Sequence, residues 1–237
     1  MRRPPASGVA AQLHTTSDKT YLCLVEVVYR CPWAAKIEDY IHRYFQVKIA
    51  VYYESLCPDS KKFITTQLAP VWRDFRGGVK VKLVPYGKAT HDKVNGKWQF
   101  TCHHGPDECY GNKMQVCILK DKSMQDTEKM EMIICLMSQA NPDKSLDTVN
   151  RLLSTLCLEQ VKKPEESDKL KRCAAGEQGS ALLAANGDKT YSVQRPLSFV
   201  PTVVVNEKFD QAVQEEAFTD LKKTVCRFST TKPPSCT

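Results

Sequence analysis

A strand that leads into a cysteine and then into a helix is the feature that most limits the folds open to this chain. Residues 47–55 are largely apolar and rich in β-branched and aromatic side chains, which predicts a strand buried on both faces. Cys57 follows, and Pro58 after it is favoured at the first position of a helix. A thiol at a helix N-terminus faces free N–H groups and the positive end of the dipole, so we expect a lowered pKa and a reactive Cys57.

The residue three positions after Cys57 determines which thiol chemistry the chain can perform. Ser60 stands where a dithiol redox enzyme carries a second cysteine. Thiol–disulfide exchange begins when a thiolate attacks a disulfide and forms a mixed disulfide, which the second cysteine then resolves. Ser60 cannot resolve it, although its hydroxyl can donate a hydrogen bond that favours the thiolate. The sequence therefore predicts a monothiol site that needs an external thiol to release its substrate.

The residues after Cys57 predict a β-α-β unit. The apolar spacing over 58–75 indicates a helix, with a kink or break at Pro70, and residues 79–86 alternate as a strand does. Because the links are short, the two strands should be parallel and joined by a right-handed crossover.

Three further regions complete the predicted architecture. Residues 88–118 are polar and cysteine-dense and are expected to form a loop region, and residues 124–175 are expected to be helical. A third strand is predicted over 200–206, followed by a short one near Phe209 and an amphipathic helix over 211–226.

Eleven cysteines in 237 residues are far more than a reducing compartment usually tolerates. We therefore expect a secreted or an endosomal/lysosomal protein. Once Cys57 and the N-terminal Cys23 and Cys31 are set aside, an even number remains, which allows four disulfides of open connectivity. Cys226 and Cys236 are a natural local pair. The cysteines expected to be oxidised are Cys102, Cys109, Cys117, Cys135, Cys157, Cys173, Cys226 and Cys236.

Charge and organisation narrow the classes of partner. The net charge is +7, but the basic residues are scattered and form no aromatic-interleaved patch, so nucleic acid is not an expected partner. No apolar stretch reaches the length of a membrane span, and we expect no cofactor. Residues 1–45 are interpreted as a leader or an atypical N-terminal extension. Residues 46–237 are interpreted as one domain with a helical insertion at about 120–180.

A second motif lies in the cysteine-dense region. It contains Cys102, His104, Gly105, Glu108, Cys109, Asn112 and Cys117 at fixed spacing. This pattern resembles the signature of the gamma-interferon-inducible lysosomal thiol reductase (GILT) family, with His103 in place of the glutamine usual there.

The resemblance covers roughly residues 47–237 and implies a thioredoxin-like fold with a helical insertion. It implies disulfide exchange on unfolding, disulfide-containing proteins in endosomes or lysosomes, with Cys57 as nucleophile. The family reductases carry two cysteines at the reactive site, so Ser60 is a departure that should weaken net reductase turnover. The order of elements also resembles the thioredoxin fold, in which a cis-proline loop faces the reactive cysteine, and Pro201 is the candidate for that loop.

Other readings of these residues stay open at this point. Zinc could be bound by Cys102, His103, His104, Cys109 and Cys117, since cysteine and histidine are its usual ligands. Cys57 could instead form a protease-like dyad with His91 or His104, or be a small buried core residue. Glu108 and Asn112 could have purely local structural roles. The alternative function is a secreted thioredoxin-fold binding protein without significant catalysis.

Overall fold

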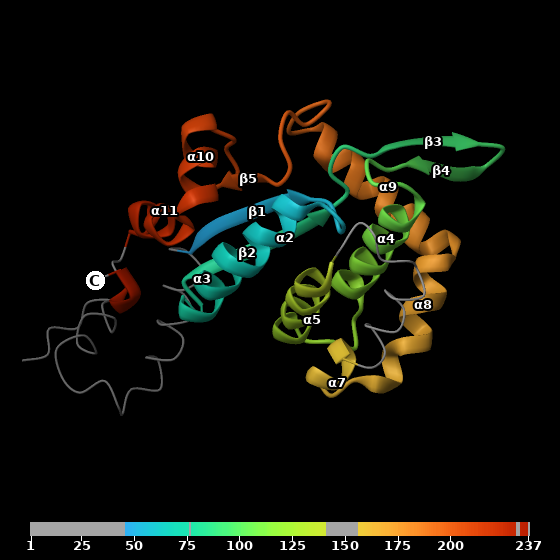
Figure 1. The fold of residues 1–237 in the computed structure, drawn as a ribbon, viewed down its shortest axis with the longest axis horizontal. Helices are drawn as coiled ribbons and strands as arrows, with labels where there is room; N and C mark the ends of the chain where they lie inside the picture. The colour runs from blue at the N-terminus through green and yellow to red at the C-terminus, as the bar shows by residue number, and fades with distance from the viewer. Residues whose placement is uncertain (1–45, 76, 141–155, 231–232, 237) are drawn as a thin grey trace, which may run out of the picture. The chain divides into compact units, whose positions relative to one another are not determined.

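The computed structural model describes residues 46–75, 77–140, 156–230 and 233–236, so the predictions for 1–45, Cys23 and Cys31 lie outside the described residues. Its main sheet has the order β2-β1-β5 (Figure 1). Strand β1 (Val47–Tyr53) pairs in parallel with β2 (Val79–Pro85) and antiparallel with β5 (Thr202–Val205). The predicted parallel β-α-β unit and the third strand are therefore confirmed.

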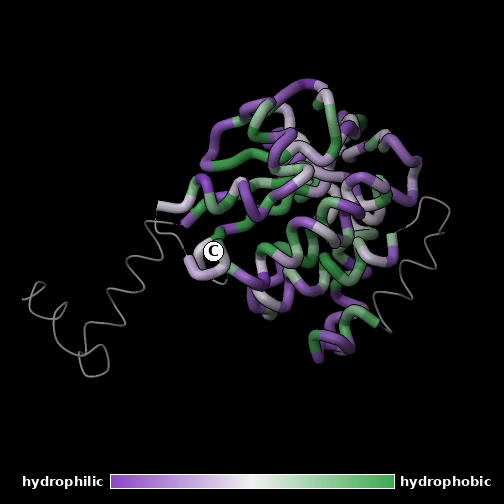
Figure 2. The backbone as a smooth tube through the Cα atoms, turned by 60° about the vertical axis from the view of Figure 1, so that its left-hand side comes forward, coloured by the Kyte–Doolittle hydropathy of each residue, from purple (hydrophilic) through white to green (hydrophobic). Residues whose placement is uncertain are grey.

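The two faces of this sheet differ. One face of β1 carries Val47, Ile49 and Val51, which belong to the main core together with residues of the surrounding helices. On the other face Lys48 is exposed and Ala50 is half-buried, so β1 is buried on both faces only toward its C-terminal end. Successive side chains of a strand point to opposite faces of the sheet, which explains why the first half of β1 has one solvent-exposed face. Figure 2 shows hydrophobic residues (green) gathered along the strands and the inner helices.

The helix after Cys57 continues past Pro70 instead of breaking. It consists of α2 (Pro58–Phe63), a π-helical segment η2 (Ile64–Leu68) and α3 (Ala69–Asp74). Proline offers no N–H and its ring crowds the carbonyl four residues earlier. The wider π turn lies just before Pro70, where it can absorb this defect without ending the helix.

The prediction of a loop over 88–118 is wrong. Strands β3 (Thr90–Val94) and β4 (Lys97–Thr101) form an antiparallel hairpin, and α4 (Pro106–Lys120) follows. Asn95 and Gly96 connect the strands with φ angles of 50° and 80°. This is the conformation that an Asn-Gly hairpin turn requires, so the turn signal was present in the sequence.

The helical part between β4 and β5 is wider than the expected 120–180. Within the described residues it runs from α4 through α5 (Asp126–Gln139), α7 (Leu158–Gln160), η4 (Pro164–Glu166), α8 (Ser167–Ala175) and α9 (Glu177–Tyr191). Figure 1 shows α4, α5, α8 and α9 as one group beside β2. None of the described helices is both long and apolar enough to cross a membrane.

The C-terminal segment forms two helices where one was predicted. They are α10 (Gln211–Thr219) and α11 (Leu221–Phe228), with η5 (Pro234–Cys236) after them. Asp220 separates the helices because its side chain accepts a hydrogen bond from Lys223 N at 2.8 Å and so caps α11. The short strand expected near Phe209 is instead a tight turn with a single bridge between Val205 and Lys208.

All eight cysteines expected to be oxidised form disulfides. The pairs are Cys102–Cys109, Cys117–Cys173, Cys135–Cys157 and Cys226–Cys236. The local pair at the C-terminus is thus confirmed. Two of the other bonds tie the helical insertion together, and the remaining one closes the loop between β4 and α4.

Candidate active site

Cys57 is the free thiol of the described residues, and it occupies the N-cap of α2. Its backbone is extended (φ −66°, ψ 124°), and its carbonyl accepts the first helical hydrogen bond from Lys61 N at 2.9 Å. The residue is 8% exposed, packed in a small apolar cluster with Tyr52, Val84 and Val200. The predicted junction of strand, thiol and helix is therefore present, but the thiol is largely covered.

The predicted lowering of the Cys57 pKa is wrong. Burial raises the pKa of the thiol above its ordinary value, and the Glu54 carboxylate also raises it. Hydrogen bonds from Ser60 and from the Asp59 N–H act in the opposite direction but do not outweigh burial. The helix terminus thus supplies the favourable contacts that were expected, while the apolar cluster around the sulfur disfavours its charged form.

Ser60 lies beneath this thiol and is fully buried. Its Oγ accepts a hydrogen bond from Glu54 N at 3.3 Å, and both its hydroxyl and its N–H face the Cys57 sulfur. The hydroxyl is therefore held by β1's end while it donates to the sulfur. In this position it stabilises a thiolate but supplies no second thiol.

The Val200–Pro201 peptide bond is cis, and it lies against Cys57. The Cys57 thiol donates to the Val200 carbonyl with an S···O distance of 3.8 Å. Gln214 of α10 holds this loop from behind, because its Nε2 donates to the Pro201 carbonyl at 3.0 Å. The structure thus brings Pro201 and Cys57 together, as the resemblance to the thioredoxin fold implied.

Helix α4 holds the loop that precedes Cys57. Asn112 is fully buried, and its Oδ1 accepts a hydrogen bond from Ser55 N at 2.9 Å. Ser55 Oγ donates to the Glu108 carbonyl at 3.1 Å. Gly111 is required here because a Cβ at this position would lie 2.5 Å from Ser55 Oγ. Glu108, Gly111 and Asn112 therefore position the loop. The sulfur itself bonds Val200 and Ser60.

The start of α4 is fixed by the other signature residues. Gly105 adopts φ 86°, a conformation that other residues rarely adopt, and the Cys102–Cys109 disulfide closes the turn around it. Glu108 is fully buried and pairs locally, since His104 N donates to its Oε1 at 3.1 Å and the His104 ring lies 2.6 Å from its Oε2. Burial raises the pKa of Glu108, and the neighbouring Glu54 adds to this.

Two alternative readings are not supported by this geometry. Zinc on the cysteines of the motif is excluded because Cys102, Cys109 and Cys117 are all in disulfides. A protease-like dyad is not formed either. His91 Nδ1 lies 2.6 Å from the Tyr86 hydroxyl, and His104 is paired with Glu108, while the sulfur of Cys57 contacts Val200 and Ser60.

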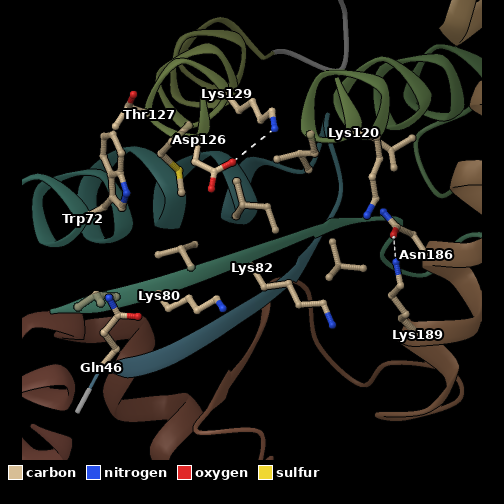
Figure 3. Close-up of a pocket in the computed structure, with 17 residues that line it drawn as sticks. Gln46, Trp72, Lys80, Lys82, Lys120, Asp126, Thr127, Lys129, Asn186 and Lys189 are labelled. Atoms are coloured by element: carbon tan, nitrogen blue, oxygen red, sulfur yellow. Dashed lines mark hydrogen bonds and ion pairs between the residues drawn. The ribbon is translucent and has the colours of Figure 1, made fainter. Parts of the chain in front are cut away.

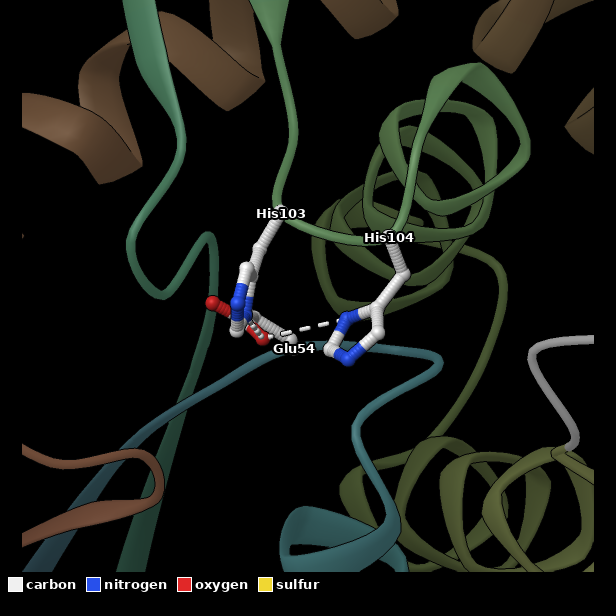
Figure 4. Close-up of side chains that lie close together, drawn as sticks. All are labelled: Glu54, His103 and His104. Atoms are coloured by element: carbon white, nitrogen blue, oxygen red, sulfur yellow. Dashed lines mark hydrogen bonds and ion pairs between the residues drawn. The ribbon is translucent and has the colours of Figure 1, made fainter.

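Glu54 is the residue of this region whose importance sequence reasoning missed. Its side chain is completely buried at the end of β1, where Oε1 accepts from Lys88 N at 2.8 Å and Oε2 lies between His103 and His104 (Figure 4). Gly87 leaves room for it, because a Cβ there would overlap the Glu54 side chain. The available signal was a carboxylate at the end of an otherwise apolar strand.

Two hollows lie along the sheet. One, of about 570 Å³, follows the edge strand β2 and is surrounded by Lys80, Lys82, Lys120, Lys129 and Lys189 (Figure 3). Cys57 does not line it. The other, of about 610 Å³, is lined partly by Tyr52 and Val204, which also pack around Cys57.

Comparison with solved structures shows the fold. The chain is similar to BdbD from Bacillus subtilis in its oxidised form, with a TM-score of 0.55 and 17% identity over 77% of this chain and 86% of that one. It is also similar to Chlamydia trachomatis DsbA, with a TM-score of 0.53 and 14% identity over 78% and 85% of the two chains. The α/β, thioredoxin-like fold is thereby confirmed.

Comparison with known sequences shows the family. The model of the gamma interferon inducible lysosomal thiol reductase family matches residues 48–161. GILT-like protein 1 of Drosophila melanogaster is 35% identical over 80% of this chain and 77% of its own length. A gamma-interferon-inducible lysosomal thiol reductase-like protein of Anopheles gambiae is 33% identical over 81% and 80%. The chain therefore belongs to the gamma-interferon-inducible lysosomal thiol reductase family.

Proposed function

We propose that this protein is a thiol–disulfide oxidoreductase that works through Cys57 alone. Its family and its fold support disulfide exchange as the activity. The observation that carries the monothiol form is the set of contacts of the sulfur, in which Ser60 stands where a dithiol enzyme has its resolving cysteine and the Val200 carbonyl accepts from the thiol. Disulfide-containing proteins are the substrate class.

The chemistry balances with two external thiols. The Cys57 thiolate attacks one sulfur of a client disulfide, and the other client sulfur leaves as a thiolate, which takes up a proton. An external thiol then attacks the Cys57 sulfur of the mixed disulfide and frees the second client thiol. This leaves a disulfide between Cys57 and the external thiol. A second external thiol attacks the external sulfur of that bond, which frees Cys57 and joins the two external thiols in a disulfide. The client is reduced by two electrons and the external thiols are oxidised by two.

Two features slow this cycle. Because burial raises the pKa of Cys57, only a small fraction of the thiol is ionised near neutral pH. Because Ser60 carries no thiol, resolution depends on a collision with an external one. Net reductase turnover is therefore weak and the mixed disulfide is long-lived.

The client segment is proposed to lie in the second hollow, which Cys57 itself does not line. Tyr52 and Val204 line both this hollow and the cluster around the sulfur, and Phe209 adds a further apolar side chain. The hollow is also lined by three lysines, Lys48, Lys80 and Lys82. It therefore suits an extended segment that carries apolar and acidic side chains. Lysosomal or secreted location is proposed from the oxidised cysteines and from the family.

The raised pKa and the low exposure of Cys57 favour one second candidate, a binding protein that keeps the fold but performs no significant exchange. Trapping separates the two. Purified protein is incubated with a partly unfolded client protein whose disulfides have been reduced and formed again. The reaction is quenched with acid, and the products are analysed by non-reducing electrophoresis and mass spectrometry. Exchange chemistry predicts a covalent adduct on Cys57 that collapses with reductant.

The matched control is Cys57→Ser, which keeps the size of the side chain and removes the nucleophile. It should form no adduct with the client. Adducts that persist in Cys57→Ser and disappear when residues 1–45, with Cys23 and Cys31, are removed would assign capture to those cysteines and favour the binding protein.

A further inference from the structure

A compact group of one carboxylate and two imidazoles lies at the end of β1, close to the loop that carries Cys57 but made of other residues than those that bond the sulfur. Glu54 comes from the strand end, and His103 and His104 come from the turn between β4 and α4. One ligand atom from each of the three residues lies within 4.8 Å of the others. Figure 4 shows both rings directed at the Glu54 carboxylate.

The spacing of these atoms fits a small metal ion. His103 Nδ1 is 3.3 Å from Glu54 Oε2. Nitrogen and oxygen ligands about 2.0–2.1 Å from a tetrahedral zinc are about 3.3 Å apart, so this pair already has the separation of two ligands on one ion. A distance of 3.3 Å is also long for a strong charge-assisted hydrogen bond.

The local charge favours a cation as well. Glu54 and Glu108 are both fully buried, and the ion pairs they make within the described residues are with His103 and His104. Backbone N–H groups of Lys88 and His104 also donate to these carboxylates, but these N–H groups carry no net charge. A divalent ion bound to Glu54 would supply positive charge beside both carboxylates.

A fourth residue, Glu108, supplies the carboxylate that often holds the second ring nitrogen of a metal-binding histidine. His104 Nδ1 lies 2.6 Å from Glu108 Oε2 and 3.4 Å from Glu54 Oε2, so with Nδ1 held by Glu108 the nitrogen of this ring left for an ion is Nε2. A carboxylate that holds the other nitrogen of a ligating histidine fixes the orientation of the ring.

We propose that Glu54, His103 and His104 form a binding site for a divalent transition-metal ion of the zinc class, with water completing the coordination and Glu108 orienting His104. Two histidines and one carboxylate are a ligand set that zinc accepts, and three protein ligands leave a position open to solvent. The exposed side of the site is at His103, whose side chain is 55% exposed, so an ion can enter there. This site does not rest on the proposed exchange activity.

Metal binding by the full-length, disulfide-intact protein without an affinity tag tests the proposal. Zn²⁺ alone is titrated by calorimetry, and Co²⁺ alone is titrated by visible absorption. We expect one equivalent of Zn²⁺, and a Co²⁺ spectrum of a four-coordinate ion without thiolate charge transfer. His103→Gln and Glu54→Gln should each weaken Zn²⁺ binding at least roughly tenfold, since loss of even an outer partner often costs that much.

Two control variants separate this site from its neighbours. Asp107→Asn removes a nearby negative charge but no ligand atom and should keep the wild-type affinity. Cys57→Ser should also keep it. His103→Gln is the safer of the two ligand variants, because the side chain is on the surface and the family signature has glutamine there; unchanged disulfides and unfolding temperature establish that it folds.

The proposal is overturned if the protein binds no stoichiometric Zn²⁺, which would leave the three residues as an ion-paired cluster only. It is also overturned if His103→Gln binds Zn²⁺ as tightly as the parent, or if Cys57→Ser abolishes binding, because the ion would then be on the thiol.

Discussion

The two groups of residues on either side of the loop 54–57 have different tasks. On one side, Ser60 and the Val200 carbonyl bond the sulfur of Cys57, and Pro201 follows Val200 through a cis peptide bond. On the other side, Asn112 and the neighbouring residues of α4 hold the backbone of the loop. The first group departs from a dithiol site at Ser60, whereas the second includes Glu108 and Asn112, two residues of the motif that resembles the family signature. Support of the loop and resolution of the mixed disulfide are therefore separable properties of this fold.

The strongest test of this separation restores the missing thiol. Ser60→Cys should raise the rate of protein disulfide reduction by roughly tenfold or more, because a resolving thiol in the same molecule has a far higher effective concentration than one in solution. The rate is measured by turbidity or fluorescence with a disulfide-linked substrate. A correctly folded Ser60→Cys variant with no gain would show that the departure at this position is not what limits turnover.

The support that α4 gives to the loop before Cys57 is tested by Asn112→Ala. Ser55 N would lose its buried acceptor, so the free energy of unfolding should fall by about 1–3 kcal/mol, measured by denaturant titration. Nδ2 of Asn112 has no hydrogen-bond partner within the described residues, so the bond to Ser55 accounts for the polar role of this amide. The comparison variant is Ser123→Ala. It removes a hydroxyl that bonds Asp121 and Glu166, not the loop before Cys57. If Asn112→Ala is no less stable than the parent, the support assigned to α4 is wrong.

The reactivity of the Cys57 thiol is also expected to depend on pH. Because the pKa of Cys57 is raised by burial, its alkylation at pH 7 should be slower than that of an unhindered thiol and should keep rising at pH values where the latter has levelled off. Glu54→Gln removes the one nearby charge that raises this pKa and should move the profile toward lower pH. Rates of alkylation by a small, neutral reagent at a series of pH values provide the measurement, with the urea-unfolded protein as reference.

The smallest expected effect concerns Glu108, near the start of the helix α4 that holds the loop before Cys57. The pKa of Glu108 is raised in the folded protein, so its contribution to stability is fully present below the ordinary pKa of a glutamate. That contribution is lost as pH rises from this ordinary value through the raised one. Glu108→Gln cannot ionise, so the decrease in unfolding free energy over this window should be smaller than in the parent. Equal pH slopes for the two proteins would contradict the assignment.

Local signals explain which parts of the fold could be predicted. The apolar run before Cys57, Pro58 at the first helical position and the alternation over 79–86 depend on neighbouring residues only, and all three predictions agree with the structure. The hairpin was missed although Asn95-Gly96 is a strong turn signal, because the many cysteines nearby suggested a loop. Helix α4 was missed because it is buried on several sides and carries Glu108, Asn112 and Gln115 inside, which hides any amphipathic pattern.

The candidate site could likewise be predicted only where neighbouring residues of the chain encode it. The nucleophile and its serine neighbour are encoded in one short segment, and the cis-proline loop follows from the fold that this segment implied. Glu54 and His103 are 49 positions apart, and only packing of the strand end against the start of α4 brings them together. The sign of the Cys57 pKa shift could not be predicted either, since it depends on side chains from β2 and from the residues before β5 that cover the sulfur.

Within the described residues, a single free thiol beside four disulfides is also a hazard to the protein itself. Each of the four bonds is a target for the attack that Cys57 makes on a client, and one such attack would start a series of wrong pairings. Exchange requires an ionised sulfur with open access to its target. The cover over Cys57, which leaves 8% of the residue exposed, therefore restrains self-scrambling throughout the life of the folded protein.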